Sequence, residues 1–229
     1  NANVANMVLA IIKKQLNTDI LNVNLNTNRP ISLLAKWMPS ENASSSETKR
    51  KAKIIREYLG LTPREYRKTL SRLRKYLDVV ECKMSAKNWS EINYTTVPSK
   101  ANLNYNNAFL KNDTERRKKY LESLKKGEVK INAGVLFPHD IVHKYADDCF
   151  WSSRVKPYDE TLEQLWKNLK NIGNIENTMV VADGSGSMTM RVDNSSKVTA
   201  LDVANALAIY CGERCQGEFA NKYITFSSK

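Results

Sequence analysis

Apolar residues recur at helical spacing through most of the first 177 residues. Residues three or four positions apart lie on one face of an α-helix, so this pattern predicts a series of amphipathic helices. The first stripe comprises Val4, Met7, Val8, Ile11, Ile12 and Leu16. An asparagine-rich loop is expected over 17–30, and further helices at 30–37, 47–59, 63–77, 79–87, 98–109, 114–126, 138–145 and 159–169. We therefore expect a helical domain over residues 1–177.

Two helix boundaries are strongly encoded. Thr62-Pro63-Arg64-Glu65 has a capping threonine, a proline suited to the first helical position and a glutamate three residues after the cap. This is the capping-box pattern. Gly60 stands where the preceding helix would end in a left-handed residue. The two predicted helices are thus joined by a very short turn.

The pattern changes after residue 177. Met179 to Ala182 is a short apolar, β-branched run, typical of a strand buried on both faces of a parallel sheet. A helix is expected over 197–215 and a second strand over 222–227. The predicted fold class is therefore multidomain, with an α-helical half (1–177) followed by a partial α/β half (178–229).

Positive charge is concentrated in the helical half. The chain has a net charge of +12, and residues 178–229 are neutral. Residues 49–75 hold eleven basic and two acidic side chains, and residues 111–130 hold eight and four. Basic side chains that neutralise the phosphates of a nucleic acid release its bound counterions, which favours binding. We therefore expect RNA as a partner. The alternative is that these side chains only form a solvated helix surface. The candidate contacts are Lys49, Arg50, Lys53, Arg64, Arg67, Lys68, Arg72, Lys75, Arg116 and Arg117.

Oxygen side chains follow the predicted strand at every second position. Asp183, Ser185 and Ser187 alternate with glycines, which let the backbone turn sharply. A carboxylate and two hydroxyls on one tight loop suit a hard divalent cation, Mg²⁺ before Mn²⁺ or Ca²⁺. The alternative is a polar turn without a metal.

The three loop residues match the D-x-S-x-S pattern of the metal-ion-dependent adhesion site (MIDAS). Residues 178–229 thus resemble the start of a von Willebrand factor A domain, which has a Rossmann-like fold. In that family a threonine and a second aspartate from later loops complete the metal shell. The resemblance implies a truncated domain that holds Mg²⁺ weakly. It also implies that an acidic side chain of a protein partner can complete the shell.

Other segments resemble an uncharacterised family of bacterial, viral and plant proteins that contain a domain of unknown function. They are KWMPS (36–40), YLGLTPREYRKTLSRLRKYLDVVE (58–81), SKA (99–101) and LFPHDIV (136–142). Members join a helical half to a von Willebrand factor A half. That layout is similar to Ro ribonucleoproteins, whose helical TROVE module binds RNA. The resemblance implies a HEAT-like ring of helices in contact with RNA, in a protein that is not an enzyme.

Two other functions stay open. The chain could be a metal-dependent protein-docking module whose basic half has no RNA role. It could also be a zinc hydrolase, because His139 and His143 are four residues apart in HDIVH and would share a helix face. The metalloprotease pattern has glutamate where Asp140 stands, and no third ligand is evident.

Composition predicts an intracellular protein. No run of 18 apolar residues occurs, so no membrane partner is expected. Cys82, Cys149, Cys211 and Cys215 are too widely spaced to resemble a secreted disulfide framework, which favours a cytoplasmic protein. Two parallel strands alone would leave sheet edges open, so we also expect self-association.

Overall fold

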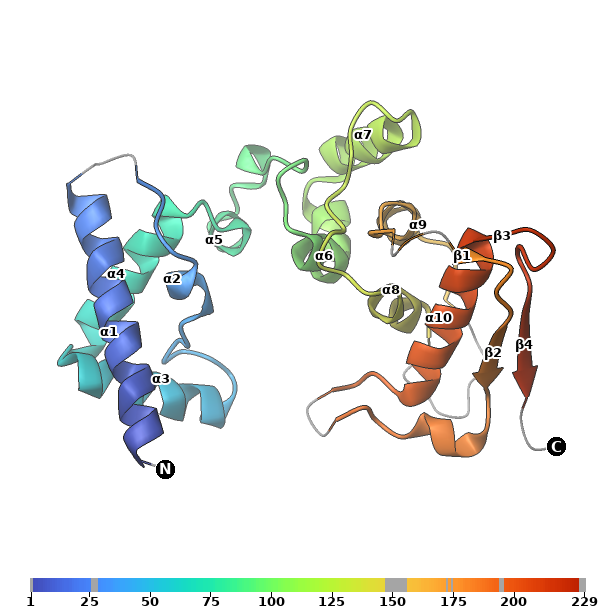
Figure 1. Ribbon diagram of the computed structural model, residues 1–229. Coiled ribbons are helices and arrows are strands. Elements are labelled where there is room, and N and C mark those ends of the chain that lie inside the picture. The colour runs from blue at the N-terminus through green and yellow to red at the C-terminus, as the bar shows by residue number, and fades with distance from the viewer. Residues whose placement is uncertain are drawn as a thin grey trace. The chain divides into compact units, whose positions relative to one another are not determined.

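A computed structural model describes residues 2–25, 29–146, 156–171, 173, 175–193 and 196–226. In these residues the chain is mostly helical, with a few short parallel strands. It divides into two compact units, Asn1–Glu91 and Ile92–Lys229. The boundary predicted at residue 177 falls inside the second unit. Figure 1 shows the elements of both units.

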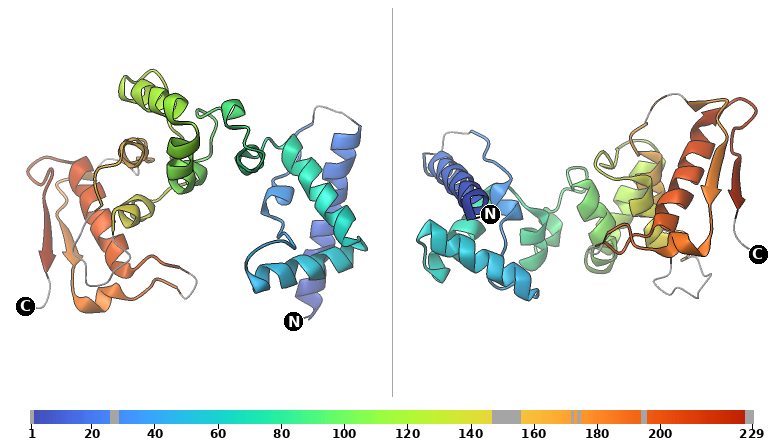
Figure 2. Two further views of the ribbon diagram at one scale, coloured as in Figure 1. Left: turned by 180° about the vertical axis from the view of Figure 1, so that it is seen from behind. Right: turned by 60° about the horizontal axis from the view of Figure 1, so that its bottom comes forward.

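The first unit is a small helical bundle. Its elements are α1 (Ala2–Asn24), α2 (Leu34–Trp37), α3 (Ser46–Leu59), α4 (Pro63–Tyr76), α5 (Val80–Ser85) and a 3-10 helix (η1, Trp89–Glu91). Helix α1 packs against α2, α3 and α4 (Figures 1 and 2). These helices enclose one hydrophobic core, formed by Leu16, Ile31, Ala35, Met38, Ala52, Tyr66, Leu70 and Leu73.

The loop predicted over 17–30 is wrong for its first half, because α1 continues to Asn24. Ile20 and Val23 pack against the core one and two turns after Leu16, so the apolar period continues between the asparagines. Asp19 is 1% exposed and accepts hydrogen bonds from the Ser32 backbone N–H (3.0 Å) and Oγ. Burial of one face therefore overrides the polar composition of this segment.

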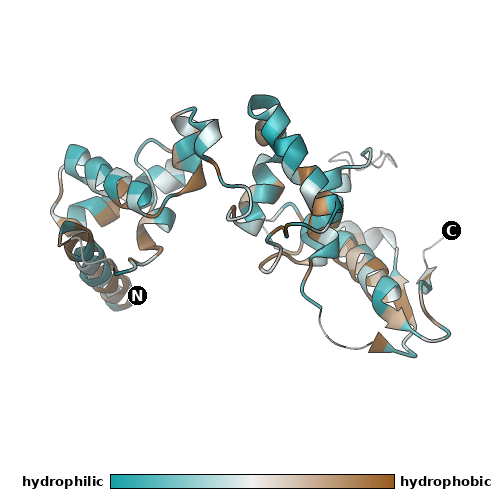
Figure 3. Cartoon of the chain, turned by 90° about the horizontal axis from the view of Figure 1, so that it is seen from above, coloured by the Kyte–Doolittle hydropathy of each residue, from teal (hydrophilic) through white to brown (hydrophobic). Residues whose placement is uncertain are grey.

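The N-terminal part of α1 does not bury its apolar stripe. Val4, Met7, Val8 and Ile11 are each at least half exposed. Figure 3 shows apolar colouring along this helix near the N-terminus. Periodicity thus predicted the helix correctly, although only its C-terminal half reaches the core.

The boundaries predicted between α3 and α4 are confirmed. Gly60 adopts φ 72° after α3, a left-handed conformation that suits glycine. Thr62 caps α4: its side chain accepts from the Glu65 backbone N–H, and the Glu65 carboxylate accepts from the Thr62 backbone N–H at 2.8 Å. This turn fixes the direction in which the two basic helices leave it.

The second unit combines helices with two small sheets. Its helices are α6 (Ser99–Asn112), α7 (Thr114–Lys125), α8 (Pro138–Tyr145), α9 (Glu160–Lys167), a 3-10 helix (η2, Gly186–Thr189) and α10 (Ala200–Arg214). Helix α6 packs against α7 and α9, while α10 packs against α8. The strand-containing segment therefore shares a compact unit with the helices that precede it.

Two pairs of parallel strands accompany α10. Strand β2 (Val180–Asp183) pairs with β4 (Tyr223–Phe226), with Val180 opposite Tyr223 and Asp183 opposite Phe226. Strand β1 (Ile175–Glu176) pairs with β3 (Cys215–Gln216). The predicted order of strand, loop, helix and second strand is confirmed. The last residue of the predicted second strand, Ser227, and the cysteine at 149 lie outside the described residues.

The predicted burial of the first strand on both faces is wrong. Helix α10 packs against β2 (Figure 2). Val181 is nevertheless 57% exposed, and only Ala182 in this strand is buried. Ile224 and Phe226 of β4 are about half exposed, at 49% and 55%. The described part of the sheet has a single helical cover, which accounts for the difference. Self-association through this sheet stays a prediction.

No helix among the described residues combines the length and apolarity needed to cross a bilayer.

Candidate functional site

Helices α3 and α4 present the predicted basic residues to solvent. Tyr66, Leu70 and Leu73 of α4 are buried, which turns the opposite side of the helix outward. The predicted contacts among these exposed side chains, here called the α3–α4 basic face, are Lys49, Arg50, Lys53, Arg64, Arg67, Lys68, Arg72 and Lys75. Eight of the ten predicted nucleic-acid contacts therefore lie on two consecutive helices of one unit.

Two further arginines in this stretch are half-buried and hold the fold together. Arg56 donates to the Glu41 carboxylate at 2.7 Å and to the Leu61 carbonyl at 3.0 Å. Arg74 donates to the carbonyls of Ala35 (2.9 Å) and Met38 (2.7 Å). A count of charges cannot distinguish these anchors from the exposed residues. Their position close to the apolar stripe is the only sequence signal for their role.

The assignment of Arg117 as a nucleic-acid contact is corrected by the structure. Its side chain is 0% exposed, the largest among the fully buried side chains of the described residues. Its guanidinium carbon lies 5.0 Å from the ring centroid of Tyr94, 5.2 Å from that of Phe109 and 5.3 Å from that of Tyr120. A phosphate cannot reach a guanidinium that is enclosed in this way.

Neutral polar side chains complete this cage around Arg117. Its Nη atoms donate to Asn102 Oδ1 (3.1 Å), Asn106 Oδ1 (3.3 Å) and Thr161 Oγ1 (3.4 Å). Within the described residues no ion pair joins Arg117 to a carboxylate, and its Nε has no hydrogen-bond partner. Removal from water disfavours the charged form, so burial lowers the pKa of Arg117 from its usual value.

Arg116 remains partly accessible. Its side chain is 43% exposed, and it bonds the Asp113 carboxylate at 2.8 Å and the Ile92 carbonyl at 2.7 Å. Asp113 also accepts from the Tyr94 hydroxyl at 2.7 Å. These bonds hold the guanidinium to the start of α7 and leave only part of it to solvent.

The oxygen-rich loop begins where β2 ends. Gly184 N–H donates to the Phe226 carbonyl of β4 at 2.7 Å, so the adjacent strand holds the loop in place. The Ser185 backbone N–H donates to Asp183 Oδ1 at 2.8 Å, and the Oγ atoms of Ser185 and Ser187 are 3.1 Å apart. The predicted residues therefore lie together at the carboxyl end of a parallel strand.

The two histidines of HDIVH have different surroundings. The His139 ring stacks on Phe137, with centroids 5.5 Å apart. His143 Nδ1 lies 2.9 Å from Asp202 Oδ2, and the same carboxylate oxygen accepts from the Thr199 backbone N–H at 2.9 Å. This bond ties α8 to the first turn of α10. Nowhere in the described ranges do three or more His, Cys, Asp or Glu side chains form a group able to hold a metal ion.

Comparison with known proteins gives a match to a family model and a similar protein that is longer than this chain. A family model described as "Domain of unknown function (DUF2828)" matches residues 41–183, more than half of the chain. The chain belongs to the DUF2828 family. The match extends from the segment before α3 to Asp183, so it includes the α3–α4 basic face and the Arg117 cage.

The DUF2828 chain is also 32% identical over 250 residues to "Uncharacterized protein L728" of Acanthamoeba polyphaga mimivirus. The alignment covers 100% of this chain and 41% of the viral protein. The chain thus spans less than half the length of that relative. No solved structure matches the chain.

Proposed function

We propose that this DUF2828 protein is a non-enzymatic RNA-binding protein whose first unit supplies the contact surface. The α3–α4 basic face carries the proposal, because its eight basic side chains are exposed on two consecutive helices. Phosphates bound by such a surface release counterions, which gives affinity without requiring a particular base sequence. The resemblance of the helical half to TROVE modules points to RNA as the nucleic acid.

Charge reversal tests this surface directly. In the full chain, Arg64, Arg67 and Lys68 are replaced by glutamate together, and binding to a fluorescent RNA is followed by anisotropy. The matched control reverses three exposed lysines of the second unit, Lys156, Lys170 and Lys222. We expect the first variant to lose affinity by at least about tenfold and the control by much less, because only the first variant removes phosphate contacts.

Salt dependence gives a second measurement. With six or more phosphate contacts, affinity falls roughly a thousandfold between about 50 and 200 mM salt. The reversal of three residues on α4 should reduce the slope of log affinity against log salt. Wild-type binding that ignores salt, or equal losses in the two triple variants, would contradict the proposal.

A second proposed function concerns the loop at the end of β2. Asp183, Ser185 and Ser187 would hold a divalent cation, Mg²⁺ first, and an acidic side chain of a protein partner would complete the metal shell. The proximity of the two serine hydroxyls favours this proposal, since it gathers hard oxygen ligands on one loop. The bound ion would supply positive charge at a docking point, in the manner of a von Willebrand factor A domain.

Titration calorimetry of the full chain with Mg²⁺ and Mn²⁺ tests the loop. Asp183→Ala should abolish saturable binding, because it removes the only carboxylate of the proposed set. Asp193→Ala, which removes a carboxylate from the segment after η2, should retain it. Unchanged binding in Asp183→Ala would show that the ion is held elsewhere.

A further inference from the structure

Trp37 is the most exposed of the large hydrophobic side chains in the described residues. It is 75% exposed, although tryptophan usually buries most of its large apolar surface. Ala35 and Met38 on either side of it are buried, at 0% and 4% exposure. The backbone of α2 therefore turns its neighbours into the core and leaves the indole outside.

Helix α4 holds this segment in place. Arg74 donates to the Ala35 carbonyl at 2.9 Å and to the Met38 carbonyl at 2.7 Å, on either side of Trp37. The Tyr66 hydroxyl donates to the Pro39 carbonyl at 2.8 Å. These bonds fix the backbone that presents the indole, so a ligand would not have to order it on binding.

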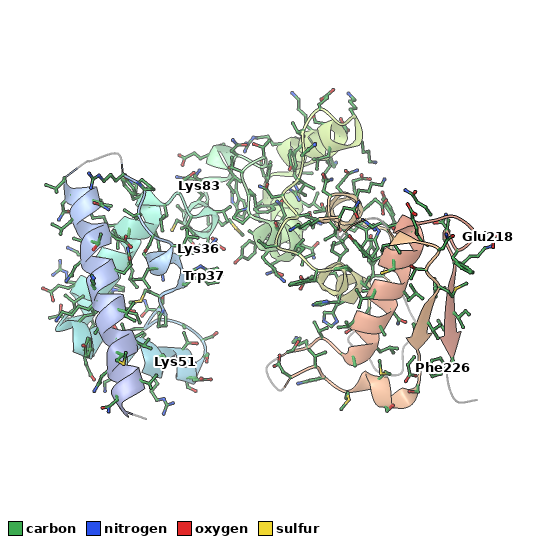
Figure 4. The ribbon with its side chains drawn as sticks, in the orientation of Figure 1. Lys36, Trp37, Lys51, Lys83, Glu218 and Phe226 are labelled. Atoms are coloured by element: carbon green, nitrogen blue, oxygen red, sulfur yellow. The ribbon has the colours of Figure 1, made fainter. Side chains whose placement is uncertain are left out.

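One cation lies beside the indole, and others lie on α4, the helix that holds this segment. Lys36 Nζ lies 5.6 Å from the Trp37 ring centroid, and Figure 4 labels both side chains at α2. Arg67 precedes Arg74 by seven residues, which places both on one side of α4. Lys75 follows Arg74 and is exposed. An exposed aromatic ring beside cations is the combination that binds single-stranded nucleic acids, through base stacking and phosphate contacts.

We propose that Trp37 stacks on an unpaired base, so that the first unit recognises single-stranded rather than duplex nucleic acid. This inference rests on the proposed RNA binding by the α3–α4 basic face, and it adds the class of ligand. Bases inside a duplex are already stacked on one another and cannot offer a free face to Trp37. The adjacent Lys36 ammonium and the exposed basic side chains of α4 favour this ligand over an apolar segment of a protein.

The experiment compares three ligands of equal length. They are a single-stranded oligouridylate, the same strand with abasic sites and a fully paired RNA duplex. Anisotropy is measured with the wild-type full chain, Trp37→Ala, Trp37→Phe and the control Tyr158→Ala. The control removes an aromatic side chain of the second unit that is 67% exposed, against 75% for Trp37. Circular dichroism confirms that each variant is folded.

We expect Trp37→Ala to lose roughly tenfold in affinity for oligouridylate, while Trp37→Phe retains most of it. The abasic strand should bind the wild type about tenfold more weakly, and Trp37→Ala should then cause no further loss. The slope against salt should stay unchanged, because the phosphate contacts remain. Tyr158→Ala should bind like the wild type.

Two results separate this inference from the proposed function. If Trp37→Ala binds oligouridylate as tightly as the wild type, or loses equally on the abasic strand, stacking is disproved while salt-sensitive RNA binding stands. If the wild type shows no salt-sensitive binding at all, both proposals fail. Tighter wild-type binding to the duplex than to the single strand would also overturn the inference.

Discussion

Arg67 on α4 and Arg117 on α7 occupy helices of similar basic composition, yet their surroundings differ completely. Arg67 is exposed beside other cations. Arg117 is enclosed by three aromatic rings and three neutral polar groups. An arginine side chain therefore presents its charge to solvent in the first unit and packs inside the fold in the second. The density of basic residues in a sequence therefore gives the charge of a segment but does not show whether that charge is accessible to a ligand.

The largest expected effect comes from removal of the buried Arg117 guanidinium. Arg117→Ala should lower the free energy of unfolding by about 3 kcal/mol, since it leaves a cavity and deprives three polar side chains of a donor. Arg117→Met should cost less, because it keeps much of the volume without a buried charge. Urea denaturation followed by circular dichroism measures both variants.

Arg116→Ala is the matched control for this prediction, as the adjacent side chain is partly exposed. RNA affinity of folded Arg117 variants should equal that of the wild type. If Arg117→Ala is as stable as the wild type but binds RNA more weakly, then Arg117 contacts RNA and is not enclosed.

Alkaline pH tests the burial of tyrosine in the first unit. Burial raises the pKa of Tyr66 from 10.0 to about 12. Between these values the unfolded chain has released a proton that the folded chain retains, so stability falls as pH rises from about 10. One such group contributes a slope of at most about 1.4 kcal/mol per pH unit.

Urea denaturation at about pH 9 and about pH 11 measures this loss. Tyr66→Phe should be less stable at the lower pH, since it lacks the hydrogen bond to Pro39, and should lose less stability between the two. Burial also raises the pKa values of Tyr94 and Tyr120 in the second unit. The pH dependence of the stability of the second unit should therefore persist in Tyr66→Phe. If Tyr66→Phe and the wild type lost the same stability of the first unit between the two pH values, the Tyr66 hydroxyl would be exposed to solvent and the prediction would be wrong.

The smallest expected effects compare two arginines of α4. Arg74→Gln should lower the free energy of unfolding by about 1.5 kcal/mol, because charged donors to the Ala35 and Met38 carbonyls are lost. Arg67→Gln should change it by less than about 0.5 kcal/mol, as an exposed side chain is altered. RNA affinity should fall a few-fold in Arg67→Gln.

Thermal or urea unfolding and anisotropy on the same two proteins provide the measurements. Equal stabilities for the Arg67 and Arg74 variants would contradict the distinction between an exposed cation and a structural anchor.

Local sequence determined the boundary between α3 and α4. Thr62 and Glu65 form their capping box from residues three positions apart, and Gly60 needs only its own backbone freedom. The strand, the loop beginning at Asp183 and the following helix were predictable for the same reason, since each is specified by adjacent residues. The length of α1 was missed because asparagines masked the continued period that places Val23 on the core.

Tertiary structure alone decided which side chains are available. The enclosure of Arg117 requires Tyr94 and Thr161, which are distant in sequence and meet it only when the segment before α6 and helix α9 pack against α7. Exposure of Trp37 likewise depends on Arg74, 37 residues further along the chain. Burial is a property of neighbours in space, whereas periodicity reports neighbours along the chain; the sequence thus encoded the charge and the elements, and packing selected the surface.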